Sequence, residues 1–132
     1  MQLKKSALAL MALTVTVSTL SVGLMAKDAD THTTSMFQGA KANTGTAIHM
    51  KMNGKNMLKV SLDFKVPDTP APTWRLIDSK GQIFTLDAFK IKGGEKREIM
   101  VPHYVDNIAK VQVYCAWAEV VLGEASFSAP VK

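Results

Sequence analysis

The residues from Leu58 to Phe64 alternate strictly between apolar and polar side chains. The apolar members of this stretch are Leu58, Val60, Leu62 and Phe64. A β-strand places every second side chain on the same face, whereas a helix repeats every 3.6 residues. The alternation therefore predicts a strand with one buried face, and it constrains the fold more strongly than any other segment.

A second alternating segment precedes this strand. In residues 46–52, the apolar residues Ile48, Met50 and Met52 alternate with polar or small ones, and we expect these three in the core, with His49 on the opposite face. Asn53-Gly54 follows, and this dipeptide is typical of a tight hairpin turn. The two segments are therefore predicted to form a β-hairpin.

The rest of the chain also predicts short strands separated by turns. The expected strands cover residues 46–52, 58–64, 74–77, 83–86, 89–91, 95–101, 111–122 and 125–127, with one short helical turn at 104–109. There is no amphipathic helix of normal length. About seven to eight short strands with regular turns predict an all-β fold, a single antiparallel β-sandwich or barrel.

The N-terminus has the order of regions that defines a secretory signal peptide. Lys4 and Lys5 precede an uncharged, mostly apolar run over residues 7–25, and small residues lead to Ala26. We expect cleavage after Ala26, which makes residues 1–26 the signal. A retained N-terminal membrane anchor is the alternative, because the apolar run is long.

Three regions and an extracytoplasmic location follow from this interpretation. Residues 1–26 are the signal, 27–35 a flexible tail and 36–132 one domain. The protein is expected in the periplasm or secreted, without a membrane contact after cleavage. Its basic residues are dispersed, which argues against a nucleic-acid partner. The single cysteine excludes an internal disulfide.

That cysteine, Cys115, lies in the sequence "VQVYCAWAEVVLGEASF". If residues 111–122 form one regular strand, Tyr114 shares the expected core face, and Cys115 shares the other face with Glu119. Trp74 and Trp117 are the residues best suited to a recognition surface, but in a chain of this size each is expected in the core. A reactive thiol needs a cation, a helix N-terminus or a metal to stabilise its thiolate. The side chains next to Cys115 supply none of these, so filling space in the core is the competing role.

An ordered set of residues resembles a known family. These residues are Phe37, Gly39, residues 44–47, Leu58 to Phe64, Pro72, Leu76, Leu86, Phe89, Lys90, Gly94, Val101, Pro102, Val111, Val113, Tyr114, Cys115, Val120, Gly123 and Ala125. From Phe37 to Phe127 the chain resembles the electron-transfer DM-thirteen domain, a small secreted β-sandwich also found beside DOMON domains in Skeletor-type proteins. The resemblance implies a redox role for Cys115. The family often has a histidine where this chain has Ala42 and Asn43.

A copper site is the alternative chemistry for a chain with these methionines and histidines. A blue-copper site needs a histidine and a methionine close to the cysteine near the C-terminus, and neither follows Cys115. In the segment "HMKMNGKNM", strand alternation separates His49 from Met50 and Met52. His32 could bind a surface metal weakly beside Asp28 and Asp30. We therefore predict no metal site and no cofactor.

The sequence predicts an electron-transfer or thiol-redox protein that acts through Cys115 with an unidentified partner protein. Hydrolase motifs and phosphate-binding glycine loops are missing from the sequence, so the interpretation leans away from a turnover enzyme. The main alternative is a binding or accessory module whose cysteine is structural. A periplasmic metal-binding protein is the weaker alternative.

Overall fold

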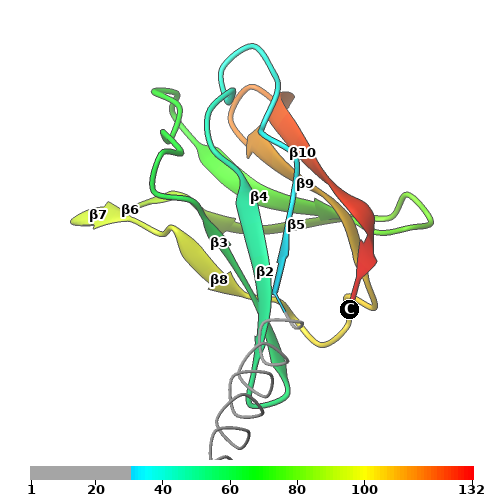
Figure 1. The fold of residues 1–132 in the computed structure, drawn as a ribbon. Helices are drawn as coiled ribbons and strands as arrows, with labels where there is room; N and C mark the ends of the chain where they lie inside the picture. The colour runs from blue at the N-terminus through cyan, green and yellow to red at the C-terminus, as the bar shows by residue number, and fades with distance from the viewer. Residues whose placement is uncertain (1–30) are drawn as a thin grey trace, which may run out of the picture. The chain divides into compact units, whose positions relative to one another are not determined.

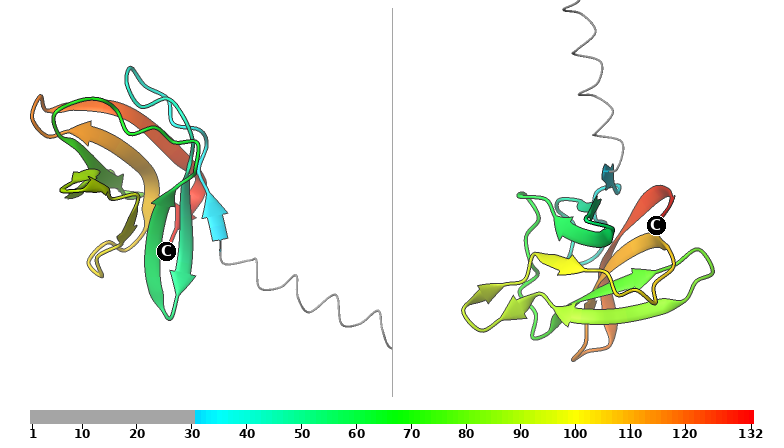
Figure 2. Two further views of the ribbon diagram at one scale, coloured as in Figure 1. Left: turned by 90° about the vertical axis from the view of Figure 1, so that its left-hand side faces the viewer. Right: turned by 90° about the horizontal axis from the view of Figure 1, so that it is seen from below.

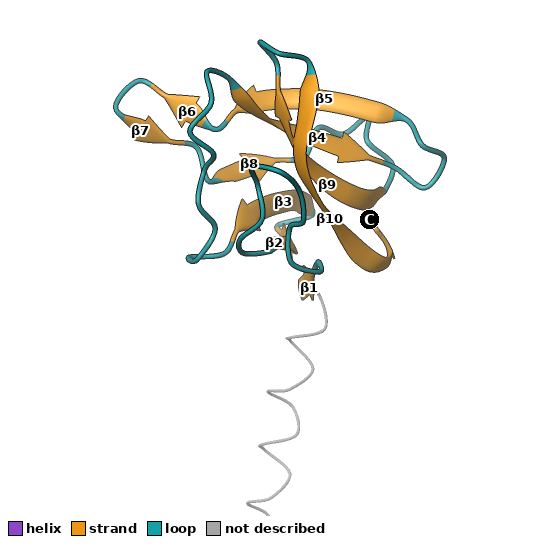
Figure 3. Ribbon diagram, turned by 90° about the horizontal axis from the view of Figure 1, so that it is seen from above, coloured by secondary structure: helices purple, strands orange, loops and turns teal. Residues whose placement is uncertain are grey.

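The computed structural model describes residues 31–132, and this part of the chain consists of strands and loops without a helix (Figure 3). The strands are β1 (Thr31–Thr33), β2 (Ala47–Met52), β3 (Lys55–Val60), β4 (Pro72–Ile77), β5 (Ile83–Ala88), β6 (Lys90–Ile91), β7 (Gly94–Glu95), β8 (Glu98–Met100), β9 (Ile108–Cys115) and β10 (Val120–Val131). The all-β prediction is confirmed. The predicted signal peptide lies outside the described residues.

Two four-stranded sheets make up the body of the fold (Figure 1). One has the strand order β1-β2-β3-β8 and the other β10-β9-β4-β5, and every pairing is antiparallel. Strands β6 and β7 form a separate two-stranded hairpin. The sheets are unclosed layers (Figure 2), and one hydrophobic cluster joins buried residues of both, such as Leu58 and Trp74. This is the predicted antiparallel sandwich rather than a closed barrel.

The predicted hairpin between β2 and β3 is confirmed. Asn53 and Gly54 have φ values of 53° and 78°, and Met52 pairs with Lys55. Two consecutive residues with positive φ are what a two-residue type I′ turn requires. This turn fixes the register of β2 against β3.

The predicted core face of β2 is wrong. Ala47 and His49 are buried, whereas Ile48 and Met50 are only half-buried and Met52 is exposed. The reason is the register with β3, which pairs Ala47 with Val60 and His49 with Leu58. Directly opposite residues of an antiparallel pair share a face. The strongly apolar strand β3 therefore determines which face of β2 is buried.

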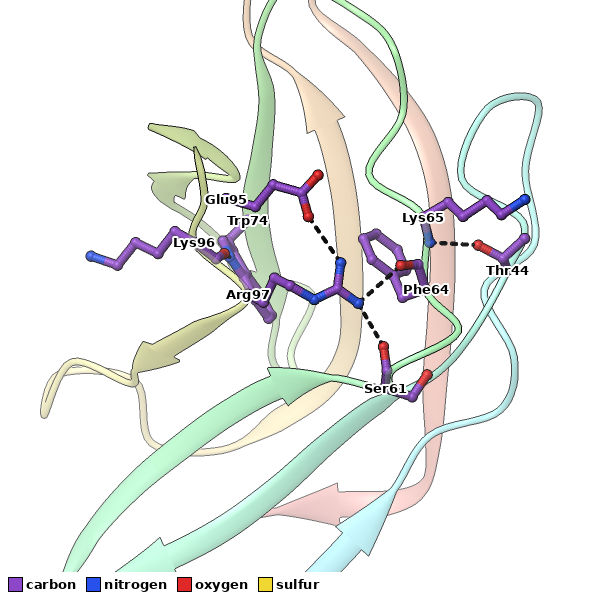
Figure 4. Close-up of polar contacts among 8 residues, drawn as sticks. All are labelled: Thr44, Ser61, Phe64, Lys65, Trp74, Glu95, Lys96 and Arg97. Atoms are coloured by element: carbon purple, nitrogen blue, oxygen red, sulfur yellow. Dashed lines mark hydrogen bonds and ion pairs between the residues drawn. The ribbon is translucent and has the colours of Figure 1, made fainter. Parts of the chain in front are cut away.

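The alternating stretch from Leu58 to Phe64 forms a strand only up to Val60. Leu62 is fully exposed, and Phe64 returns to the core. Figure 4 shows how this turn is held: Arg97 donates through Nη2 to the backbone carbonyls of Ser61, at 2.8 Å, and Phe64, at 2.9 Å. Two charge-assisted hydrogen bonds to main-chain oxygens stabilise a bend that the side-chain pattern does not indicate.

An aromatic stack fills the centre of the core. Trp74 stacks on Phe89 with 4.5 Å between ring centroids, and Phe64 lies 5.5 Å from Phe89. The indole Nε1 of Trp74 donates to the carbonyl of Lys96 at 3.0 Å. Trp74 is therefore a core residue, as expected, with its polar atom satisfied.

The first described residues form an edge strand. Strand β1 lies in the segment that was expected to be a flexible tail, yet it pairs with β2. The residue pairs are Thr31 with Met50, His32 with His49 and Thr33 with Ile48. Residues 27–30 lie outside the described part. The expected helical turn at 104–109 is also not formed, because β9 begins at Ile108. No helix that could cross a membrane occurs among the described residues.

Candidate functional site

Cys115 is the last residue of β9 and is followed by a tight turn over residues 116–119. The chain reverses there, so that Val120 of β10 pairs with Cys115, and the N–H of Glu119 donates to the Cys115 carbonyl at 2.7 Å. Glu119 has a φ of 56°. The prediction of one continuous strand over 111–122 is therefore wrong, and Glu119 does not share a strand face with Cys115.

Cys115 lies on the inner face of β9, which corrects the predicted core face. Only 2% of the residue is exposed, whereas Tyr114 is half-buried, with the guanidinium of Arg75 4.0 Å from the centre of its ring. The pairing with β4 explains this orientation, because it sets Val113 opposite Trp74. The largest aromatic residue of the core selects the odd-numbered side chains of β9 as the buried set.

Backbone N–H groups, two of them from the turn, donate hydrogen bonds to the thiol. The N–H of Ala118 points at Cys115 Sγ, at an N–S distance of 3.4 Å. This hydrogen bond is the largest cause of a lowered pKa of the Cys115 thiol; burial opposes it, and the amides of Ala71 and Trp117 add smaller lowering effects. The activating groups missing from the neighbouring side chains are thus present in the neighbouring backbone.

Thr69 adds a hydroxyl group to the same environment. Its Oγ1 is buried and forms no hydrogen bond of standard geometry within the described residues. It nevertheless lies close enough to the thiol to make the smallest of the contributions that lower the pKa of Cys115. Thr69 is distant from Cys115 in sequence, and no motif marks it.

Cys115 and Thr69 line a hollow of about 400 Å³ on the surface. Its other walls are mostly apolar and include Trp117, Val121 and Leu122, and Lys41 is the one charged residue among the described residues that line it. Trp117 is 75% exposed, so the expectation that it packs in the core is wrong. A thiol with a lowered pKa therefore lies beside an apolar surface depression.

One wall of the hollow depends on close backbone contact. The carbonyl of Leu122 accepts hydrogen bonds from the N–H groups of Lys41 and Ala42, at 3.1 and 3.0 Å. A Cβ atom on Gly123 would lie 2.0 Å from the Ala42 carbonyl oxygen, and one on Gly39 would lie 2.2 Å from that of Leu122. The loop at 39–42 and β10 can meet this closely only because both positions are glycine.

A second polar cluster lies on the other sheet, around His49. The imidazole is fully buried, its Nδ1 is 3.3 Å from Nδ1 of His32, and its Nε2 is 2.9 Å from Oδ1 of Asn56. Burial lowers the pKa of His49, and this effect outweighs the hydrogen bond with Asn56 that raises it. The sequence interpretation missed this pair because it placed His32 in a flexible tail.

The other sequence candidates do not join either cluster. Met50 lies on the face of β2 opposite His49, as strand alternation predicted, although that face is the outer one. His103 follows β8 and packs edge-on against Tyr104. No group of three or more His, Cys, Asp or Glu residues that could hold a metal occurs among the described residues.

Comparisons of the chain with protein-family models, curated proteins and solved structures found no match. The resemblance to the electron-transfer DM-thirteen domain therefore stays a prediction.

Proposed function

We propose that this chain is a secreted or periplasmic thiol-redox protein that exchanges electron pairs with a partner protein through Cys115. The observation that supports it most directly is the hydrogen bond from the Ala118 N–H to Cys115 Sγ. A thiolate is the reactive form of cysteine, and a hydrogen-bond donor to sulfur stabilises it. The resemblance to the DM-thirteen domain points to the same residue.

The chemistry that fits a lone cysteine is thiol–disulfide exchange. The Cys115 thiolate attacks one sulfur of a partner disulfide, the partner S–S bond breaks, and a mixed disulfide forms while the second partner sulfur leaves as a thiolate. Cys115 is thereby oxidised and the partner sulfur reduced. Attack by the freed partner thiolate on the other partner sulfur re-forms the original disulfide and releases Cys115, with no net transfer of electrons. A net transfer needs a dithiol protein as electron donor: its first thiolate attacks Cys115 Sγ and releases the partner as a dithiol. Its second thiolate then attacks the first donor sulfur, which forms the donor's disulfide and releases the Cys115 thiolate.

The hollow defines how a partner must approach. Cys115 is 2% exposed, yet it forms part of the wall of an open depression. Apolar residues at the rim, including Trp117 and Val121, are exposed at 75% and 45%. An incoming disulfide therefore has to be carried on a segment that fits an apolar surface, which favours a protein partner over a small polar thiol.

The proposal is tested by the rate at which the purified protein reacts with an aromatic disulfide reagent as a function of pH. The native thiol is expected to react at a lower pH than the same thiol in denaturant, because its pKa is lowered only in the folded chain. Cys115→Ser gives the background rate. A thiol that is silent until the protein is unfolded would refute the proposal.

That negative result would support the second candidate, a binding or accessory module with a structural cysteine. The observation that favours this candidate is the burial of Cys115 beside exposed Trp117 and Val120. Free cysteine is commonly a small buried hydrophobic residue. In this case Cys115→Ala would leave partner binding unchanged, whereas Trp117→Ala would weaken it.

A further inference from the structure

His32 and His49 are directly opposite each other on β1 and β2. Their Nδ1 atoms are 3.3 Å apart, and their ring centroids are separated by 5.5 Å. His49 is buried, whereas His32 lies on an exposed edge strand. Solvent therefore has access to one member of the pair, and the protein interior holds the other.

The hydrogen bond on the far side of His49 determines where its lone pair is. Asn56 Oδ1 lies 2.9 Å from Nε2 and can only accept, so Nε2 carries the proton. In a neutral imidazole the other nitrogen is then unprotonated. Nδ1 of His49 thus directs a lone pair toward His32.

This arrangement is the one in which proteins prepare a histidine to bind a metal. A metal-binding histidine almost always donates its second ring N–H to an oxygen atom, which fixes the tautomer and the orientation of the ring. Asn56 supplies that oxygen from β3, the strand next to β2.

The distance between the two nitrogens also fits a tetrahedral metal ion such as zinc. Zinc binds histidine nitrogen at about 2.0–2.1 Å with tetrahedral geometry, which places two ligand nitrogens about 3.3–3.4 Å apart. The observed separation of the Nδ1 atoms is 3.3 Å. Square-planar Cu²⁺ would require adjacent nitrogens about 2.8–3.0 Å apart at the same bond length.

We propose that His32 and His49 bind Zn²⁺ through their Nδ1 atoms at the β1–β2 edge, with Asn56 as the residue that orients His49. The ion replaces the proton between the two nitrogens, and His32 then carries its proton on Nε2. Water fills the other two positions. The site lies on the opposite sheet from Cys115 and does not depend on the thiol chemistry.

The test is a calorimetric titration of the purified chain with ZnCl₂ in a Cys115→Ser background, which removes the competing thiolate. One Zn²⁺ per chain is expected. His32→Ala should abolish this binding, and Asn56→Ala should weaken it by about 10–100-fold. His103→Ala is the matched control and should bind Zn²⁺ unchanged, because His103 packs against Tyr104 and not against the pair.

A second measurement does not depend on any histidine variant folding correctly. Histidine ring ¹⁵N resonances of the Cys115→Ser protein should shift at Nδ1 of both His32 and His49 when Zn²⁺ is added, and His103 should not respond. Binding that persists in His32→Ala, or Nδ1 shifts confined to His32, would overturn the proposal. Absence of stoichiometric binding would show that the pair is only hydrogen-bonded.

Discussion

Cys115 and His49 are both buried, ionisable side chains at strand pairings, but their polar contacts come from different parts of the chain. The polar contacts of the Cys115 thiol come mainly from the backbone amides of residues 71, 117 and 118. The imidazole of His49 contacts two side chains, His32 and Asn56. The polar environment of Cys115 therefore depends on the path of the main chain, and that of His49 depends on the identity of two side chains.

This difference determines what can be changed by mutation. Replacing a neighbour of Cys115 leaves its amide donor in place, so the chemistry of the thiol should change only when the turn or its supporting loop is distorted. Replacing His32 or Asn56 removes a contact of His49 directly. Single substitutions should therefore change the properties of the imidazole by removing one of its hydrogen-bond partners. They should change the properties of the thiol only by moving the backbone that donates to it.

Among changes at the two sites themselves, the largest effect is expected where the backbone is changed. Gly123→Ala would place a Cβ 2.0 Å from the Ala42 carbonyl oxygen, so the loop at 39–42 must move away from β10. We expect a loss of about 1–3 kcal/mol in the free energy of unfolding, measured with urea. Gly94→Ala is the matched control, because nothing lies within 4 Å of its added Cβ. Equal stability of the two variants would contradict the close packing of this wall.

The pH dependence of stability tests the His49 side of the comparison. The pKa of His49 is lowered from 6.5 by burial. Below pH 6.5 the unfolded chain therefore binds a proton that the native protein does not, and stability falls as the pH decreases toward the native pKa. One such group contributes at most about 1.4 kcal/mol per pH unit.

Urea unfolding with a chelator present, between about pH 5 and 7.5, measures this dependence. His49→Gln should flatten the curve below pH 6.5, the ordinary value for the imidazole. His103→Gln should leave it as in the natural protein. An unchanged slope in His49→Gln would assign the acid sensitivity to other groups.

A smaller effect is expected at the thiol, where one side chain contributes beside the backbone. Thr69→Val removes the hydroxyl, which makes the smallest of the contributions that lower the pKa of Cys115. The pKa of the thiol should therefore rise slightly. Lys41→Gln should leave it unchanged, although Lys41 lines the same hollow, since its charge is not among the causes of the lowering. Thiolate absorbance as a function of pH measures both. A larger pKa shift in Lys41→Gln than in Thr69→Val would show that charge, and not hydrogen bonding, lowers the pKa of Cys115.

The smallest effect on stability is expected at Trp117. Its side chain is 75% exposed, so Trp117→Ala should change the free energy of unfolding by no more than about 0.5 kcal/mol. The same variant should alter how fast a bulky disulfide reaches Cys115, because Trp117 lines the hollow. Trp74→Ala is the contrasting variant, with a cost of about 3–5 kcal/mol expected for a fully buried aromatic residue. A large loss of stability in Trp117→Ala would contradict its exposed position.

Local patterns in the sequence predicted much of the fold. The alternation at Leu58 and Val60 identified β3, and Asn53-Gly54 identified the hairpin turn, because both depend on residues that are neighbours in the chain. The faces of β2 and β9 were assigned wrongly. Those faces are decided by the strands that pair with them, and a single strand's composition does not contain that information.

The candidate sites were predicted less completely than the fold. Cys115 could be selected as the only cysteine, but its activating donors are amide groups, which every residue carries and no motif marks. His32 and His49 are separated by 16 intervening residues, and only the pairing of β1 with β2 brings them together. One signal was available in the sequence. His49 lies in the middle of the predicted strand over residues 46–52, and a polar residue at a strand centre invites a search for partners.

In the proposed function, the backbone turn after Cys115 separates the reactivity of the thiol from the recognition of a partner. The groups that set the acidity of the sulfur are main-chain amides, whereas the surface around it is made of side chains such as Trp117 and Val121. Substitutions at the rim can therefore create new partner preferences while the thiol keeps its properties. In protein engineering, the rim side chains could be changed for each target protein while the turn and the Cys115 thiol stay the same.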